Sequence, residues 1–368
     1  MRKNELKASY RIILLPGRHC RMEAVGKWQE SGILRAVSAA FPALRPRLAV
    51  LDALRGLAAL WVGLYHFTGN GTYNGGFPAE MPLKWLGTYG WLGVYVFFVI
   101  SGFILPWTMD RGGYRLRDYG RFLWKRVLRL HPLYLVSAGA MLVPFWFGSG
   151  GGMAARTWAD WWPHFFYLND ALHRPWLMEI YWTLALEAQY YLAIGLLFPL
   201  LKHRHAVVRW AVMAAVIVLP LGAAQFRTLP MFAALFAMGI LTFWRLSGRA
   251  GKFAFAFSLL VCGLVTWRAM GWPPALLGVL TAVAIAEVKS HYRFLGWPGS
   301  LSYPFYLFHL VVAGLFMPLL AEMPRGPWQD TAAVLGLFAV SLVLSQVLHR
   351  WIERPSMRWS SAVHYRRS

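Results

Sequence analysis

The residues best suited to chemistry lie within segments that are otherwise apolar, and the segment from about 50 to 67 holds the first pair. Arg55 and His66 are separated by ten residues. A helix turns about 100° per residue, so it would project both side chains from one face, roughly 16 Å apart along its axis. Alone, an arginine would extend toward polar surroundings, and a histidine would hydrogen-bond a neighbouring helix. Their common face favours a functional pair, with His66 as a candidate general base.

Glu187 is a second candidate for acid–base chemistry. It is the only acidic residue well inside any of the apolar segments, and it lies in the segment 180–201. At a depth comparable to that of His66, its carboxylate would fix the tautomer of the imidazole and raise its basicity. The alternative is a neutral glutamic acid that hydrogen-bonds for helix packing.

A polar stripe follows the segment 299–320. Ser302, Tyr306 and His309 have i, i+4, i+7 spacing and share one helical face. Ser101, on another apolar segment, precedes a glycine, and such a step suits close helix packing or a local bend. Tyr306, His309 or Ser101 would be able to donate a hydrogen bond to an oxyanion, and the sequence does not rank the three.

Arg126 and Arg129 end a basic stretch and are three residues apart, so they are neighbours on one helical face. Two guanidinium groups in this arrangement suit bidentate capture of phosphate. The phosphate would belong to a soluble ligand or to a lipid headgroup, and the pair alone does not distinguish the two.

Other catalytic signatures are absent from the sequence. It contains no GxSxG elbow and no P-loop, and its histidines do not show zinc-ligand spacing with acidic partners. We therefore predict that the site has no metal.

The segments that carry these residues are long apolar runs. Of the 368 residues, 58% are hydrophobic and 14% are charged, and this charged fraction is about half that of a soluble domain. A helix of about 20 apolar residues crosses a hydrocarbon core of roughly 30 Å. The sequence predicts an all-α, polytopic membrane helix bundle of about ten transmembrane helices, near residues 50–67, 89–107, 131–147, 180–201, 207–223, 230–244, 253–270, 273–288, 299–320 and 331–350.

The net charge of +22 follows the predicted topology. With the N-terminus inside, lysine and arginine concentrate in the inner segments, as the positive-inside rule predicts. We expect both termini in the cytoplasm, the loop 148–179 outside, and a multi-pass protein of the plasma (inner) membrane. Anionic lipid is then the default partner of the charge, and nucleic acid is excluded. The outer loops hold only Lys84, Arg156, Arg174, Arg227, Arg268 and Arg325.

The chain divides into three predicted parts. Residues 1–47 are a basic cytosolic N-terminal arm, residues 48–355 the transmembrane domain, and residues 356–368 a basic cytosolic tail. Met22 is an alternative to Met1 as the true start.

Taken in order, these segments resemble the acyltransferase 3 family of integral membrane O-acyltransferases. The resemblance covers about residues 48–355 and rests on LDALRGLAALWVGLYHF, GVYVFFVISGFIL, RVLR, WTLALEAQYYL, SLSYPFYLFHL and IERP. It implies transfer of an acyl group, commonly acetyl, from cytosolic acyl-CoA to a hydroxyl of an extracytoplasmic glycan, a lipid-linked sugar or a related acceptor. It also implies that Arg55 and His66 are essential and that Arg126 and Arg129 bind the donor.

The arrangement of the residues suits that chemistry. Arg126, Arg129 and Arg55 would hold the phosphates of coenzyme A at the inner side, with the pantetheine arm extended along the first helix toward His66. His66 would remove the proton of the acceptor hydroxyl as it attacks the thioester. The sequence leaves open a covalent acyl-histidine intermediate.

A different class of function also fits part of the pattern. Intramembrane His, Glu and Arg equally suit a proton-coupled transporter or flippase of a glycan or lipid-linked sugar. The sequence shows no paired inverted halves with broken helices, which argues against transport. A scaffold without catalysis would leave the buried Arg55, His66 and Glu187 unexplained.

Overall fold

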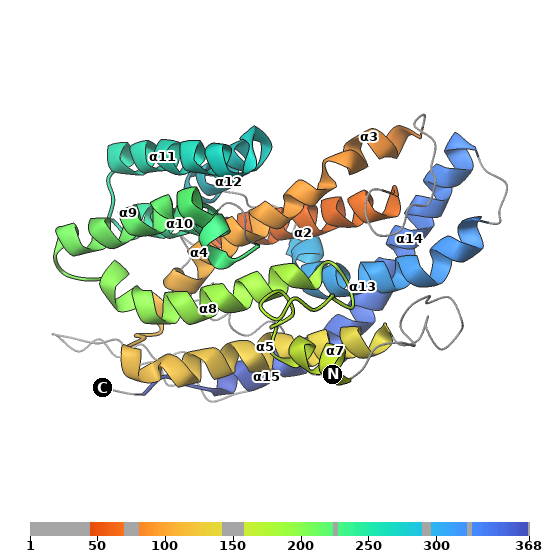
Figure 1. The fold of residues 1–368 in the computed structure, drawn as a ribbon, viewed down its shortest axis with the longest axis horizontal. Coiled ribbons are helices and arrows are strands. Elements are labelled where there is room, and N and C mark those ends of the chain that lie inside the picture. The colour runs from red at the N-terminus through yellow and green to blue at the C-terminus, as the bar shows by residue number, and fades with distance from the viewer. Residues whose placement is uncertain are drawn as a thin grey trace, which may run out of the picture.

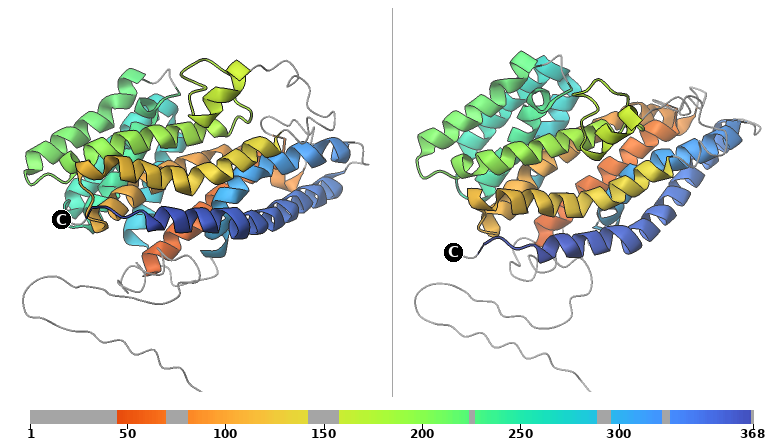
Figure 2. Two further views of the ribbon diagram at one scale, coloured as in Figure 1. Left: turned by 90° about the horizontal axis from the view of Figure 1, so that it is seen from below. Right: turned by 60° about the horizontal axis from the view of Figure 1, so that its bottom comes forward.

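The computed structural model describes residues 45–69, 81–141, 158–223, 227–288, 296–321 and 326–366. Within these ranges the regular structure is entirely helical, as predicted, and the helices form one bundle (Figures 1 and 2). The predicted basic arm, residues 1–47, lies almost wholly outside the described residues.

Each apolar segment predicted from the sequence contains a helix in the structure. The long helices are α2 (Arg45–Phe67), α4 (Gly93–Arg111), α5 (Tyr119–Ala140), α8 (Tyr181–Leu201), α9 (Ala206–Ala223), α10 (Leu229–Leu246), α11 (Lys252–Met270), α12 (Trp272–Glu287), α13 (Gly296–Ala321) and α14 (Pro327–Leu348). The shorter elements are α3 (Pro82–Thr88), η2 (Gly90–Leu92), η3 (Leu116–Asp118), α7 (Trp158–Phe165), the π-helical turn η5 (His349–Glu353) and α15 (Arg354–Ala362).

Six helices in the described part of the chain are long and apolar enough to cross a membrane, which gives the chain the character of a multi-pass membrane protein. α9 and α12 are apolar as well, but shorter. The predicted count of about ten spans and the cytosolic position of both termini remain predictions. The six lie within Leu83–Arg111, Tyr181–Leu201, Leu229–Leu246, Lys252–Met270, Trp297–Leu320 and Pro327–Ala362.

α5 begins earlier than the sequence predicts. The segment 108–130 reads as an inner loop, whereas the helix already starts at Tyr119. Phe122 is fully buried and lies on the face that Leu133 continues three turns later, so the apolar face of the helix extends into the basic stretch. The basic side chains interrupt the apolar run without interrupting the helix.

The C-terminal segment packs along α5. The Ser360 hydroxyl donates a hydrogen bond to the Lys125 carbonyl (2.9 Å), and the Lys125 ammonium donates one to the Val363 carbonyl (2.7 Å). In Figure 2, α15 runs beside α5, and α14, which leads into it, packs on α13. The predicted tail, residues 356–368, therefore begins inside a packed helix.

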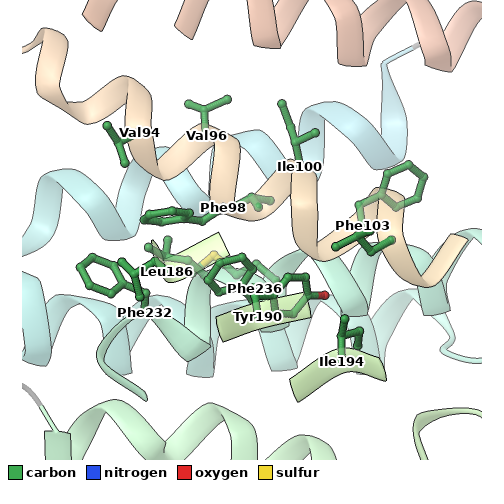
Figure 3. Close-up of a cluster of buried hydrophobic side chains, with 14 of the residues drawn as sticks. Val94, Val96, Phe98, Ile100, Phe103, Leu186, Tyr190, Ile194, Phe232 and Phe236 are labelled. Carbon is green, nitrogen blue, oxygen red and sulfur yellow. The ribbon is translucent and has the colours of Figure 1, made fainter. Parts of the chain in front are cut away.

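An aromatic core joins α4, α8 and α10 (Figure 3). The ring centroids of Phe98 and Phe236 are 5.2 Å apart, and Tyr190 stacks on Phe236 with centroids 4.1 Å apart. α4 and α10 approach closely because each presents a glycine: Gly102 lies against the Phe236 carbonyl, and Gly239 lies against the backbone of α4. This packing fixes the middle of α4 against α8.

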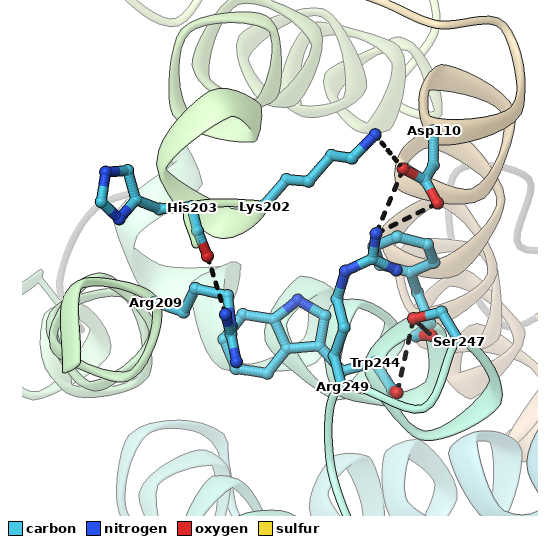
Figure 4. Close-up of polar contacts among 8 residues, drawn as sticks. Asp110, Lys202, His203, Arg209, Trp244, Ser247 and Arg249 are labelled. Carbon is cyan, nitrogen blue, oxygen red and sulfur yellow. Dashed lines mark hydrogen bonds and ion pairs between the residues drawn. The ribbon is translucent and has the colours of Figure 1, made fainter. Parts of the chain in front are cut away.

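A charged latch joins the same three helices at one end (Figure 4). The carboxylate of Asp110, on α4, lies 2.6 Å from the ammonium of Lys202 and 3.3 Å from the guanidinium of Arg249. Lys202 follows α8, and Arg249 follows α10. The latch therefore ties the ends of the helices whose middles share the aromatic core.

Candidate active site

The crossing of α2 with α13 positions the face of α2 that the sequence predicts to be functional, the face of Arg55 and His66. A Cβ atom added to Gly56 would lie 2.6 Å from the Cβ of Pro298, and one added to Gly63 would lie 2.7 Å from the ring of Phe305. Only glycine permits these approaches, because any larger side chain would push the helices apart. The predicted face of α2 is thus a packed interface with α13.

His66 lies near one end of this crossing. Its side chain is buried, and its ring centroid is 5.1 Å from that of His309 on α13 and 5.0 Å from that of Tyr65. Among the described residues, His66 Nδ1 finds no hydrogen-bond partner and is sealed from solvent. A buried ring nitrogen without a partner is costly, so this imidazole is free to bind another group.

Three arginines gather near the middle of α2, about three helical turns from His66. Arg129 interacts electrostatically with Arg55 and Arg126. The guanidinium of Arg126 lies over the rings of Phe122 and Tyr191, 5.4 and 5.8 Å from their centroids. The structure thus brings together, from α2 and α5, the three arginines that the sequence predicts as phosphate ligands.

Two carboxylates that the sequence reasoning did not assign belong to the same cluster. Asp52 interacts electrostatically with Arg55 and Arg129, and Glu353 interacts with Arg129. Two carboxylates against three guanidinium groups leave a positive excess, which attracts an anion. Asp52 precedes Arg55 by one helical turn, and Glu353 lies in the IERP motif. The place of either residue in the sequence does not show that Asp52 and Glu353 both lie near Arg129.

The π-helical turn η5 brings Glu353 to this cluster. Nδ1 of His349 and Oε2 of Glu353 are 2.6 Å apart, and both side chains are buried. π-helical turns are rare and frequently occur at functional sites. The turn links α14 to α15 and places the carboxylate near Arg129 of α5.

Lys125 is the neighbour of Arg126 on α5, and burial together with Arg126 lowers its pKa. Its ammonium bonds the Val363 carbonyl and lies 5.4 Å from the ring centroid of Tyr365. Lys125 is therefore directed toward the C-terminal segment.

Glu187 has partners other than His66. Its carboxylate accepts a hydrogen bond from the Ser101 hydroxyl at 2.8 Å and interacts electrostatically with Tyr191. The contact expected between His66 and Glu187 is absent, since α8 meets α4 and α5 whereas α2 packs on α13. Equal depth along two helices does not make the helices neighbours.

The three candidate oxyanion donors already have partners. The Tyr306 hydroxyl lies 2.7 Å from the Thr183 hydroxyl and 3.1 Å from the Ile180 carbonyl oxygen. Nδ1 of His309 lies 2.8 Å from the carbonyl oxygen of Tyr306, and Ser101 donates to the carboxylate described above. A substrate would have to displace one of these bonds to receive a proton from it.

The site therefore consists of an anion-binding cluster near the middle of α2 and an unpaired base near the end of the same helix. Among the described residues, no group of three or more His, Cys, Asp or Glu side chains could hold a metal ion. The residues present suit an anionic ligand with a reactive group far from its charge.

Comparisons with known proteins indicate the class of reaction. The family described as acyltransferase domain matches residues 48–350. The acyltransferase MdmB of Streptomyces mycarofaciens is 26% identical over 365 residues, covering 85% of this chain and 92% of that protein. ORF330 of Acidianus two-tailed virus, named as an acetyltransferase, is 31% identical over 156 residues, covering 42% of this chain and 41% of that protein. No solved structure gives a significant match.

Proposed function

The chain belongs to the acyltransferase domain family, and we propose that it is a membrane O-acyltransferase. In this proposal it moves an acyl group, most simply acetyl, from cytosolic acyl-CoA to a hydroxyl of an extracytoplasmic glycan or related acceptor. One observation carries the proposal: Arg55, Arg126 and Arg129 converge near the middle of α2, while the unpaired His66 lies about three turns further along the same helix, near its end.

The donor fits this separation. Coenzyme A carries its phosphates at one end of a long pantetheine arm and its thioester at the other. Arg126 and Arg129, together with Arg55, bind the phosphates through charge-assisted hydrogen bonds. Roughly 16 Å of helix separates Arg55 from His66, a distance that an extended pantetheine arm spans.

His66 then acts as the general base. Its imidazole takes the proton of the acceptor hydroxyl while the oxygen attacks the thioester carbonyl. The tetrahedral intermediate collapses with cleavage of the carbon–sulfur bond, and the imidazolium returns the proton to the thiolate of coenzyme A. The products are the acyl ester and free coenzyme A.

Mass spectrometry of surface glycans tests the acceptor class. We would compare cells that lack the gene with cells complemented by the wild type or by His66→Ala. A mass increment of one acyl group should return with the wild type only, since His66→Ala keeps the donor site and removes the base. Glycans of unchanged mass in all three strains, with less glycan exported when the gene is absent, would instead favour a flippase.

A further inference from the structure

Two imidazole rings meet where α2 crosses α13, and each carries a buried nitrogen without a partner. Among the residues that the structure describes, these nitrogens are Nδ1 of His66 and Nε2 of His309. The ring centroids are 5.1 Å apart. An imidazole N–H···N hydrogen bond joins rings whose centres are about 5 Å apart, so the separation fits such a bond.

The protonation pattern of His309 follows from its partners. Its Nδ1 lies 2.8 Å from the carbonyl oxygen of Tyr306 and 3.1 Å from that of Phe305. Carbonyl oxygens only accept hydrogen bonds, so Nδ1 carries the proton and Nε2 presents a lone pair. Toward His66, His309 is therefore an acceptor. The oxyanion-donor role suggested by the sequence would need a proton that the neutral Nε2 does not hold.

Packing holds His309 still and leaves His66 more freedom. The His309 side chain is fully buried, Phe305 stacks on it nearly parallel at 5.8 Å, and Phe67 meets it edge-on at 6.0 Å. The interplanar angle between the two imidazoles is 43°. Rotation about the Cβ–Cγ bond of His66, a torsion with a broad energy well, can bring its Nδ1–H onto His309 Nε2.

We propose that His309 is the positioning residue of the general base, its Nε2 accepting a hydrogen bond from Nδ1–H of His66. This bond fixes the tautomer of His66 in which Nε2 has the free lone pair, and it aims that nitrogen at the acceptor hydroxyl. His309 thus takes the orienting role that the sequence suggested for Glu187. The inference deepens the proposed function and rests on it for the reaction that the pair serves.

The proton balance is simple. The acceptor hydroxyl gives its proton to Nε2 of His66, and the imidazolium so formed is stabilised through Nδ1–H by His309, which stays neutral. The acceptor oxygen forms its bond to the thioester carbon, and the carbon–sulfur bond breaks. His66 Nε2 then returns the proton to the departing thiolate, so that both histidines end in their starting states.

A matched pair of substitutions separates this role from a structural one. In His309→Gln, the side-chain oxygen can reach the position of Nε2 and accept from His66. In His309→Asn, the side-chain amide can still donate to the backbone carbonyl, but no atom reaches the position of Nε2. The full-length protein carries each change, and size-exclusion chromatography checks that both variants fold.

The first measurement is acyl transfer from acetyl-CoA to glycan extracted from membranes of cells lacking the gene. For His309→Asn, kcat should fall about 10- to 100-fold, as expected for one hydrogen bond to a charged group, with KM for acetyl-CoA unchanged. His309→Gln should retain kcat within about tenfold of the wild type. Equal kcat in the wild type and His309→Asn, or equal losses in both variants, would overturn the inference.

The second measurement does not depend on acyl transfer. Diethyl pyrocarbonate modifies unprotonated imidazole, and peptide mass spectrometry follows its reaction at His66. The rate should fall several-fold in His309→Asn and recover in His309→Gln, because an acceptor at Nδ1–H raises the nucleophilicity of Nε2. This pattern in a protein without transferase activity would retain the histidine pair and refute the proposed function. Equal rates in all three proteins would refute the pair.

Discussion

Replacing Arg126 and Arg129 distinguishes a donor site from a lipid anchor, because only a donor site predicts a loss of affinity for acetyl-CoA. Replacing both by Gln removes two charge-assisted contacts, each worth about 1.5–3 kcal/mol before compensation. We expect acetyl-CoA binding to weaken by about 3 kcal/mol, or more than 100-fold, when measured by isothermal titration calorimetry in detergent.

Arg117→Gln is the matched control for this pair, because Arg117 is an exposed arginine of the same basic stretch. Its replacement should leave the affinity for acetyl-CoA unchanged. An unchanged affinity in the double variant as well would assign Arg126 and Arg129 to lipid headgroups.

Glu187→Gln tests whether the carboxylate acts on His66. The amide oxygen of Gln can still accept the bond from Ser101, but as a neutral group it accepts more weakly than the carboxylate. We expect a loss of about 1 kcal/mol, up to tenfold in kcat/KM, and an unshifted pH–rate profile, since Glu187 does not contact His66 in the structure. A shifted profile would restore the pairing that the sequence suggested.

The spacing of residues within one helix was a better guide to the site than the expected depth of residues on two different helices. Arg55 and His66 share a face because the period of α2 decides it, and the structure places His66 against His309 of α13 and Arg55 beside Arg129 of α5. The meeting of His66 with His309 depends on which helices cross, and no spacing within either helix contains that information. The place of Glu353 beside Arg129 escaped prediction for the same reason.

At the scale of helices, the close contact between α4 and α10 predicts that a larger residue at this contact lowers the stability of the protein. A methyl group on Gly102 would press on the Phe236 carbonyl, and such overpacking costs about 1–3 kcal/mol. Gly102→Ala should therefore lower Tm by several degrees in a thiol-reactive melting assay.

Gly336→Ala is the control for this change, because Gly336 lies inside α14 with open space around its Cβ position. Alanine is a better helix former than glycine by about 1 kcal/mol, so this variant should melt at the same temperature or higher. Equal changes of Tm in both variants would contradict the close packing of α4 on α10.

The positions of the helices were predictable because apolar runs and helices coincide in this chain. The start of α5 was not, because three arginines and one lysine at 121–129 interrupt the apolar pattern, while the buried Phe122 keeps this part of the helix packed. The continuation of the last helix past residue 350, through the π-helical turn η5 into α15, also escaped prediction, since the hydropathy falls there while the helix goes on.

At the scale of the whole molecule, the prediction concerns sidedness. In a protein whose natural Cys20 and Cys262 are replaced, single cysteines at the exposed positions Ala171 and His205 should react differently. A membrane-impermeant maleimide added to intact cells should label Ala171→Cys and spare His205→Cys until the membrane is permeabilised, because the charge distribution places residue 171 outside. Labelling of position 205 alone would invert the topology and place the arginine cluster outside the cytoplasm.

The central claim, base-catalysed acyl transfer from acyl-CoA, is tested most directly by turnover of purified His66→Ala. The assay would supply radiolabelled acetyl-CoA and glycan from membranes of cells lacking the gene, with donor binding measured on the same preparation. We predict unchanged affinity for acetyl-CoA and a fall in turnover by a factor of about 10² to 10⁴, because the imidazole is needed for proton removal and not for the phosphates. Turnover near the wild-type rate with intact donor binding would contradict the account.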